Sequence, residues 1–173
     1  MFDLINGLPV HPLVVHAVVV LLPLAAVGTL AIAVRPQWRA RYGVLVTGAA
    51  LIATVLTPVA TSSGEALESH VGNPGEHAEL GEQLIWFAIP LLLLSAALTW
   101  LGRRAEQAEK AGTPDAAAAA RPGTGLSRTV AVLAVVAALA ATVQIYRVGD
   151  SGARAAWGDQ VSSSSATSGD ADD

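Results

Sequence analysis

Long apolar runs separated by short polar segments dominate the sequence. Four runs contain almost no charged side chains, and they cover residues 12–34, 43–61, 84–101 and 129–148. About 20 apolar residues in an α-helix cross the hydrocarbon core of a bilayer, so each run is close to the length of one spanning helix. A transmembrane β-barrel would need short segments of alternating hydrophobicity, which the sequence lacks. The pattern predicts an all-α integral membrane protein, folded as a four-helix transmembrane bundle.

Several residues predict where these helices begin and end. The His11-Pro12 pair suits a helix start, because proline in the first turn costs no hydrogen bond. The helical pattern of the second run can continue above the bilayer through residues 62–70. A turn precedes the third run, and it predicts a single helix from Pro74 to about Leu101.

The fourth run also indicates how the helices pack. Its alanines recur at helical spacing, so they share one face. Small side chains let helix backbones approach closely in lipid, where packing rather than water exclusion drives association. We therefore expect this face to lie against other spans; its members are Ala134, Ala138 and Ala141.

The runs divide the chain into one membrane domain and a tail. Residues 1–158 form the membrane domain, with a polar linker at 103–128 that contains proline, glycine and five consecutive alanines. The tail, residues 159–173, is rich in serine and aspartate, a composition typical of disordered segments. We predict that this tail is disordered and lies outside the cell.

Composition supports a membrane location and excludes several chemistries. Hydrophobic residues make up 53% of the chain and charged residues only 14%, and the mean hydropathy is +0.52. The chain has no cysteine, so it cannot form disulfides, thiolate metal sites, cysteine-ligated iron–sulfur centres or covalent haem links. It also lacks a nucleotide-binding glycine motif, a nucleophile elbow and a basic nucleic-acid patch. These absences make enzyme chemistry of the soluble type and nucleic-acid binding unexpected.

The distribution of charge predicts the orientation in the membrane. Eight of the ten Lys and Arg residues fall in two loops, residues 35–42 and 103–128. Cytoplasmic loops carry an excess of positive residues, so these two loops should be cytoplasmic. The prediction is a multi-pass protein of the cell membrane with both its N- and C-termini outside. Eleven of the 14 acidic residues then face outward.

This topology gathers all the histidines at the outer face, and they are the candidates for cofactor chemistry. Haem b can be held by one histidine from each of two helices. His16 on the first helix and His77 on the third are the expected pair, because both should be helical and at similar depth. The four histidines are His11, His16, His70 and His77.

A divalent metal is the alternative cofactor at the outer face. Imidazoles suit zinc, copper and iron, and carboxylates bind divalent cations through oxygen. Candidate metal ligands are His11, His70 and Glu76. A simpler interpretation is also open: histidines are tolerated at headgroup level, and a carboxylate-rich face is often only solvated.

The sequence resembles a known family, the bacterial four-span membrane proteins grouped as domain of unknown function 2231. The resemblance covers residues 8–158 without the linker and includes His77 at the start of the third span. It implies the fold and the membrane location rather than an activity. Where the family often has a histidine before Ser-Gly-Ala, this chain has Asp150, which would remove or alter any metal site there. The matching stretches are Leu8-Pro9-Val10-His11-Pro12-Leu13-Val14-Val15-His16 and Gly149-Asp150-Ser151-Gly152-Ala153-Arg154-Ala155-Ala156-Trp157-Gly158.

Three functions remain open from the sequence. The first is a membrane protein that binds haem b or a metal through its outer histidines. The second is a cofactor-free structural or accessory subunit, which would pack against a larger membrane complex or against copies of itself. The third is an oligomeric channel or transporter, for which the spans offer only a few threonines, one serine and Gln144 as a polar lining.

Overall fold

Four long apolar helices form a bundle, as the sequence predicts. The structure is a computed structural model that describes residues 4–5, 8–71, 75–112 and 125–167. Four candidate spans are long and apolar enough to cross a membrane: His11–Val34, Gln37–Leu67, Glu76–Lys110 and Gly125–Trp157. The all-α fold class and the four-span architecture are therefore confirmed.

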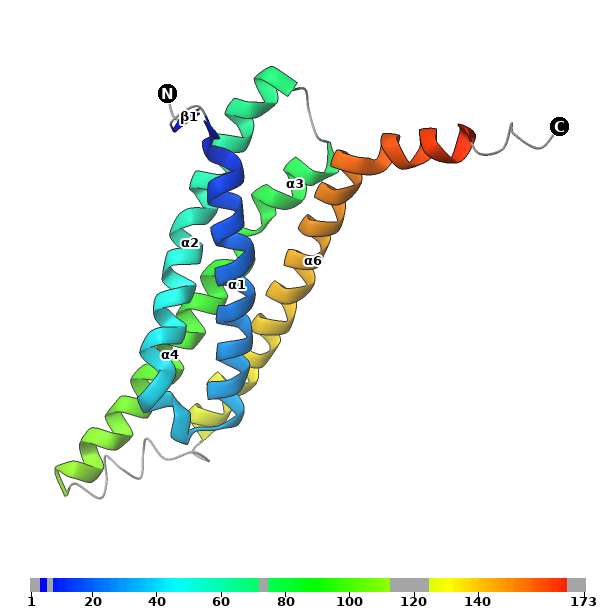
Figure 1. Cartoon of the computed structure of the whole chain (residues 1–173). Coiled ribbons are helices and arrows are strands. Elements are labelled where there is room, and N and C mark those ends of the chain that lie inside the picture. The colour runs from blue at the N-terminus through cyan, green and yellow to red at the C-terminus, as the bar shows by residue number, and fades with distance from the viewer. Residues whose placement is uncertain (1–3, 6–7, 72–74, 113–124, 168–173) are drawn as a thin grey trace.

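The bundle consists of two antiparallel hairpins (Figure 1). In the first, α1 (Val10–Val34) is followed by α2 (Gln37–Val71), and Pro36 lies between them where it cannot continue α1. In the second, α3 (Glu76–Gln83) and α4 (Ile85–Lys110) lead toward α6 (Gly125–Thr167). Before α1, the two-residue strands β1 (Leu4–Ile5) and β2 (Leu8–Pro9) pair antiparallel.

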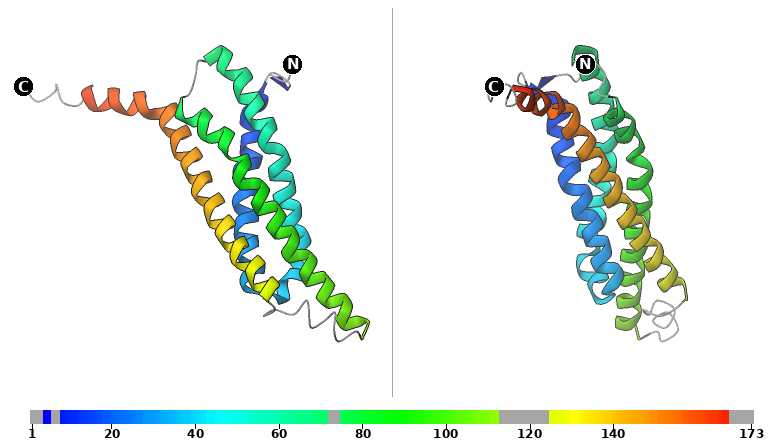
Figure 2. Two further views of the ribbon diagram at one scale, coloured as in Figure 1. Left: turned by 180° about the vertical axis from the view of Figure 1, so that it is seen from behind. Right: turned by 90° about the vertical axis from the view of Figure 1, so that its right-hand side faces the viewer.

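The first long helix of each hairpin packs against the second long helix of both hairpins. α1 contacts α2 and α6, and α4 likewise contacts α2 and α6. Figure 2 shows the four helices running side by side from two angles. We call the end that contains His11 and His77 the histidine end, and the end that contains Arg35 and Arg39 the arginine end. The chain enters α1 at the histidine end, and α6 returns to it (Figure 1).

The third span is two helices rather than the one we predicted. α3 ends at Gln83, and the Leu84 N–H bonds to the Gly81 carbonyl, three residues back, instead of to Leu80. Gly75 precedes α3 with a φ of 60°, a left-handed conformation that glycine adopts without strain. The shift in hydrogen bonding at Leu84 gives α3 its own direction beside α6 (Figure 1).

Of two other helix limits, one agrees with the expected limit and one differs from it. α2 continues through Val71, so the extension beyond the second apolar run is confirmed. α6 remains helical through Thr167 and thus enters the tail that we expected to be disordered from residue 159. Figure 1 shows the last part of α6 turning away from the bundle axis. In the segment predicted to be a linker, residues 103–128, α4 continues to Lys110 and α6 begins at Gly125. Residues 113–124 lie outside the described part.

The core is built from leucine and many alanines. Leu22 and Ala25 of α1 pack with Ala53 of α2 and Leu91 of α4, and all four are fully buried. The predicted alanine face of α6 is confirmed, since Ala134, Ala138 and Ala141 are also fully buried. Small side chains at these positions bring the helix backbones close together. Many other large apolar side chains point outward, as a lipid-facing surface requires; Val20, Leu45 and Leu93 are examples.

Candidate functional site

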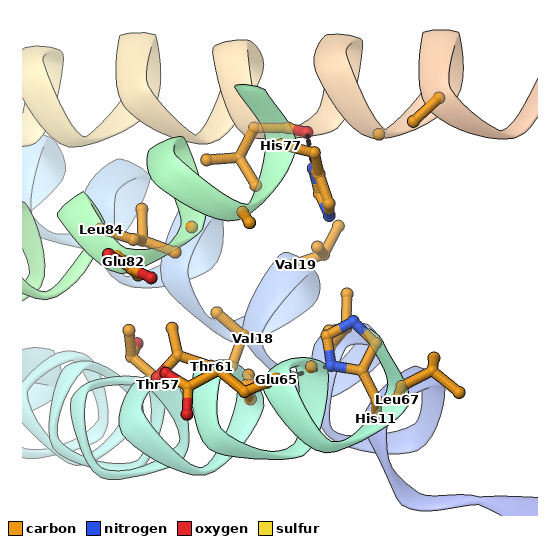
Figure 3. A pocket seen from close by; sticks show the side chains of 18 of the residues that line it. His11, Val18, Val19, Thr57, Thr61, Glu65, Leu67, His77, Glu82 and Leu84 are labelled. Carbon is orange, nitrogen blue, oxygen red and sulfur yellow. Dashed lines mark hydrogen bonds between the residues drawn. The ribbon is translucent and has the colours of Figure 1, made fainter. Parts of the chain in front are cut away.

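A cavity of about 350 Å³ lies inside the histidine end. It is bounded by α1 and α2 on one side and by α3 and α6 on the other, and two of the four histidines line it. Figure 3 shows His11 entering this space from one side and His77 from the opposite side. The cavity therefore collects side chains from both hairpins.

His11 is fixed by the end of α2. Its Nδ1 lies 2.9 Å from the Ala60 carbonyl oxygen and 3.3 Å from the Ser63 hydroxyl. The Ser63 hydroxyl itself donates to the same Ala60 carbonyl at 3.0 Å. Beside the ring stands Gly64, where an added Cβ would come within 3.0 Å of the His11 Cε1. Helix α2 thus offers a hydrogen-bonding edge and an open space that admits this imidazole.

His77 is fixed by α6 in the same manner. Its Nδ1 lies 3.1 Å from the Val148 carbonyl oxygen and 3.3 Å from the Ser151 hydroxyl. The Ser151 hydroxyl donates to the Val148 carbonyl at 3.0 Å. A Cβ on Gly152 would lie 2.9 Å from the His77 Cε1. These contacts orient the second imidazole across the cavity from the first.

The hydrogen bonds determine the protonation of both neutral rings. A carbonyl oxygen can only accept, so each Nδ1 must carry the proton that it shares with Ala60 or Val148. Each Nε2 then keeps its lone pair. Among the residues that the structure describes, no hydrogen bond occupies either Nε2, and Figure 3 shows both rings with that edge toward the cavity. A histidine that binds a metal commonly donates its other N–H to a carbonyl in this way.

The rest of the cavity wall is mainly apolar. Carboxylates are limited to Glu65 and Glu82, which are exposed and mark the opening toward solvent. The apolar lining is contributed by Val15, Val18, Val19, Ala60, Leu67, Ala78, Leu84, Val148, Ala155 and Ala156. Thr57 and Thr61 also line the cavity, so an apolar ligand would meet the imidazoles and these two threonines as neutral polar side chains.

Of the two expected haem ligands, His77 lines the cavity opposite His11 and not opposite His16. His77 lines the cavity, whereas His16 is exposed and its Nδ1 bonds back to the Pro12 carbonyl of its own helix at 2.5 Å. His11 occupies the place that we expected for His16. The reason is rotational, because five residues turn a helix by about 140° and point the two rings in different directions.

Of the expected metal ligands, His11 lines the cavity and Glu76 does not. His11 is in the cavity, and Glu76 is an exposed residue in the first turn of α3 that does not line it. The side chain of His70 lies outside the described residues. In the described part of the chain, there is no group of three or more His, Cys, Asp or Glu residues that could hold a metal ion.

Reasoning from the sequence missed the residues that hold His11. Ser63 and Gly64 carried no predicted role, although Ser151-Gly152 formed part of the family resemblance. A signal was present: each hairpin begins with a histidine and ends its second span with Ser-Gly. Reading the chain for this internal repeat would have singled out His11 and His77 together.

Comparison with known proteins agrees with the architecture. Residues 7–165 match a family described as predicted membrane protein (DUF2231). The chain belongs to this family. No curated protein and no solved structure matches the chain. The DUF2231 description gives a membrane location and no activity, so the geometry of the cavity is the guide to function.

Proposed function

We propose that this DUF2231 protein is a small membrane cytochrome that binds haem b between His11 and His77. The observation that carries the proposal is the pair of Nδ1-tethered imidazoles whose Nε2 atoms enter one apolar cavity from two hairpins. When bound, a haem with two histidine ligands supplies reversible one-electron transfer. The expected ligand pair is therefore revised to His11 and His77, with His16 outside the site.

The donor set favours a haem over a bare metal ion. A zinc or copper ion in a protein usually requires three or four protein ligands. The described part of the cavity offers two imidazoles and no cluster of three ligating residues. A haem would bring four ring nitrogens of its own, so His11 and His77 would supply enough protein ligands for its iron.

The protein would contribute orientation, polarity and exclusion of water. The Ala60 and Val148 carbonyls hold the rings in the tautomer whose Nε2 keeps its lone pair, and they fix the orientation of each ring. The valine, leucine and alanine walls restrict water near the ligands, which favours the less charged, reduced state. The exposed glutamates at the opening leave one edge of the site in contact with solvent.

The charge pattern supports a site at the outer face of the membrane. Eight of the ten Lys and Arg residues fall in residues 35–42 and 103–128, as expected for the cytoplasmic side. The histidine end, both termini and the cavity would then face outward. An electron carrier that docks there would be extracytoplasmic.

Absorption spectra of the purified protein test the proposal directly. The wild-type protein in mild detergent, expressed with a haem supply, should show a Soret band that shifts and sharpens on reduction, together with bound iron. His11→Ala and His77→Ala should each remove the band or lower haem occupancy at least about tenfold, because one axial ligand is lost. His16→Ala is the matched control and should retain the wild-type spectrum.

Two results would contradict the assignment. A folded, colourless, iron-free protein that also fails to take up added haem would favour the cofactor-free accessory subunit. Full haem occupancy in both His11→Ala and His77→Ala would place the haem elsewhere.

A further inference from the structure

The two histidines are held by contacts that repeat from one hairpin to the other. In each case the Nδ1 bonds to a helix carbonyl, the serine three residues later approaches the same nitrogen, and the following glycine makes room for the ring. The first set is Ala60, Ser63 and Gly64, and the second is Val148, Ser151 and Gly152. We call each set a histidine seat.

The surroundings of the seats repeat as well. Each histidine begins the first span of its hairpin, and each seat lies near the end of the second span. Pro23 follows His11 by 12 residues, and Pro90 follows His77 by 13. In the first span of each hairpin, 39% of the most apolar stretch is buried. In the second span of each hairpin, the buried share is 22%. The hairpins therefore correspond in connectivity, in the burial of their spans and in the hydrogen bonds to their histidines.

This equivalence explains why the cavity lies where it does. Both hairpins enter and leave at the histidine end, so exchanging them corresponds to a rotation about an axis along the bundle. The cavity is bounded by both hairpins, and each presents one imidazole to it. A ligand between the hairpins is consequently approached by two similar groups from opposite sides.

We infer that the chain is a duplicated histidine hairpin, in which the Ser-Gly of each second span is the positioning element for the histidine of the same hairpin. The Ala60 and Val148 carbonyls fix the proton on Nδ1, and Ser63 and Ser151 hold the same edge of each ring. Gly64 and Gly152 admit the ring at the distance that turns Nε2 into the cavity. The ligating purpose of this arrangement rests on the proposed function. The tautomer that the seats impose does not depend on haem.

Enlarging one glycine tests one seat at a time. Gly64→Val should displace the His11 ring, because even a Cβ at this position would lie 3.0 Å from Cε1. Gly152→Val should displace His77 from α6 in the same way, since its Cβ would lie 2.9 Å from that ring. The controls are Gly48→Val on α2 and Gly149→Val on α6, where an added Cβ meets nothing within 4 Å.

The first readout is the tautomer of each histidine in the haem-free protein. Nitrogen NMR of ¹⁵N-histidine-labelled full-length protein in detergent distinguishes a protonated from an unprotonated ring nitrogen. Both His11 and His77 should be Nδ1–H in the wild-type protein. Gly64→Val should convert His11 alone to a mixture dominated by Nε2–H, and Gly152→Val should convert His77 alone. Both controls should retain the wild-type pattern.

The second readout is haem binding. Loss of one seat should weaken haem affinity about 10- to 100-fold, as for other groups that orient a metal ligand. Ser63→Ala and Ser151→Ala should weaken it by similar factors to each other, and Ser63→Thr should restore it because the hydroxyl returns. Where a valine variant does not fold, Gly64→Ala and Gly152→Ala provide the same comparison with a smaller side chain.

The two readouts separate this inference from the proposed function. Seat-specific loss of the Nδ1–H tautomer in a protein that never binds haem would uphold the duplicated seat and overturn the cytochrome. Haem binding with unchanged tautomers and unchanged affinity in both glycine variants would uphold the cytochrome and overturn the seat. A wild-type protein with His11 or His77 in the Nε2–H form would also overturn the seat.

Discussion

At the arginine end of the bundle, the guanidinium of Arg39 donates to three acceptors. At the histidine end, His11 and His77 each donate through Nδ1, and no residue that the structure describes bonds to their Nε2. Arg39 is only 3% exposed, and it bonds to the Ile32 and Ala33 carbonyls and to the Ser127 hydroxyl. The carbonyls belong to the last turn of α1, which has no further helical N–H groups to satisfy them. Arg39 therefore closes α1 and joins α1, α2 and α6.

The packing around Arg39 also differs from the packing around His11 and His77. Gly102 of α4 lies against Arg39 so closely that an added Cβ would come within 2.4 Å of the Arg39 Cβ. The histidine end has a cavity of about 350 Å³ between its hairpins instead. A closely packed polar group whose hydrogen bonds are made, such as Arg39, stabilises the fold. A polar group with a free lone pair beside a cavity is suited to binding.

Removing the arginine should give the largest loss of stability. Arg39→Met removes the side-chain donor of the buried Ile32 and Ala33 carbonyls, and we expect it to lower the free energy of unfolding by about 3 kcal/mol. Arg39→Lys should not restore it, because an ammonium cannot reproduce the planar fork of donors. Denaturant titration in detergent, followed by circular dichroism, measures the change.

The control for this prediction is Arg41→Met, since Arg41 is exposed and only stacks against Tyr42. Equal stability of the two variants would show that Arg39 is not a stabilising junction. Folded Arg39→Met protein should keep the wild-type histidine tautomers, because its defect lies at the opposite end of the bundle.

A smaller loss is expected at Gln144, which supports the histidine end from within the core. Gln144 is 2% exposed and donates to the Leu80 carbonyl at 3.0 Å. That carbonyl needs a partner because the Leu84 N–H bonds to Gly81 instead. Gln144→Leu should destabilise the protein by about 1 kcal/mol. It should also loosen α3 and broaden the NMR signals of His77.

Gln107→Leu is the matched control, because Gln107 is exposed on α4. If Gln144→Leu leaves both the unfolding midpoint and the His77 signals at their values in this control, the Gln144 bond has no role in holding α3.

The smallest effect should be a gain in stability. Thr29 is fully buried, and its hydroxyl has no hydrogen-bond partner in the part of the chain that the structure describes. Unlike His11 and His77, Thr29 does not line the cavity. Thr29→Val keeps the shape and removes the unsatisfied hydroxyl, so it should stabilise the protein by about 0.5–1 kcal/mol.

Thr57→Val provides the contrast, because the Thr57 hydroxyl donates to the Ala53 carbonyl at 2.9 Å. This substitution should produce no gain in the same unfolding experiment. A loss of stability in Thr29→Val equal to that of Thr57→Val would indicate that the Thr29 hydroxyl is satisfied.

The spans could be predicted because each depends on a local property of the chain. An apolar run of sufficient length must be helical in lipid, where every backbone polar group needs an internal partner. The alanine face of α6 followed from spacing alone. The break at Leu84 could not be predicted, because its freed carbonyl is satisfied by Gln144, a residue 64 positions away in the sequence.

The candidate site could be predicted only in part. His77 was selected, but His11 and His16 stand at the same end of one helix, and only the rotation of α1 against α2 chooses between them. That rotation depends on how the alanines and leucines of four helices interlock. The recurrence of a histidine followed by Ser-Gly was legible in the sequence, yet its meaning depends on contacts across 52 and 74 residues.

The sequence by itself determined the number of spans, the family and the concentration of positive charge at one end, since these depend on composition and on segments of about 20 residues. The tertiary structure decided which histidines face each other, which nitrogen of each ring is free, and where the cavity lies. These features require side chains from separate helices to meet at hydrogen-bonding distance. Only the packed bundle defines such distances.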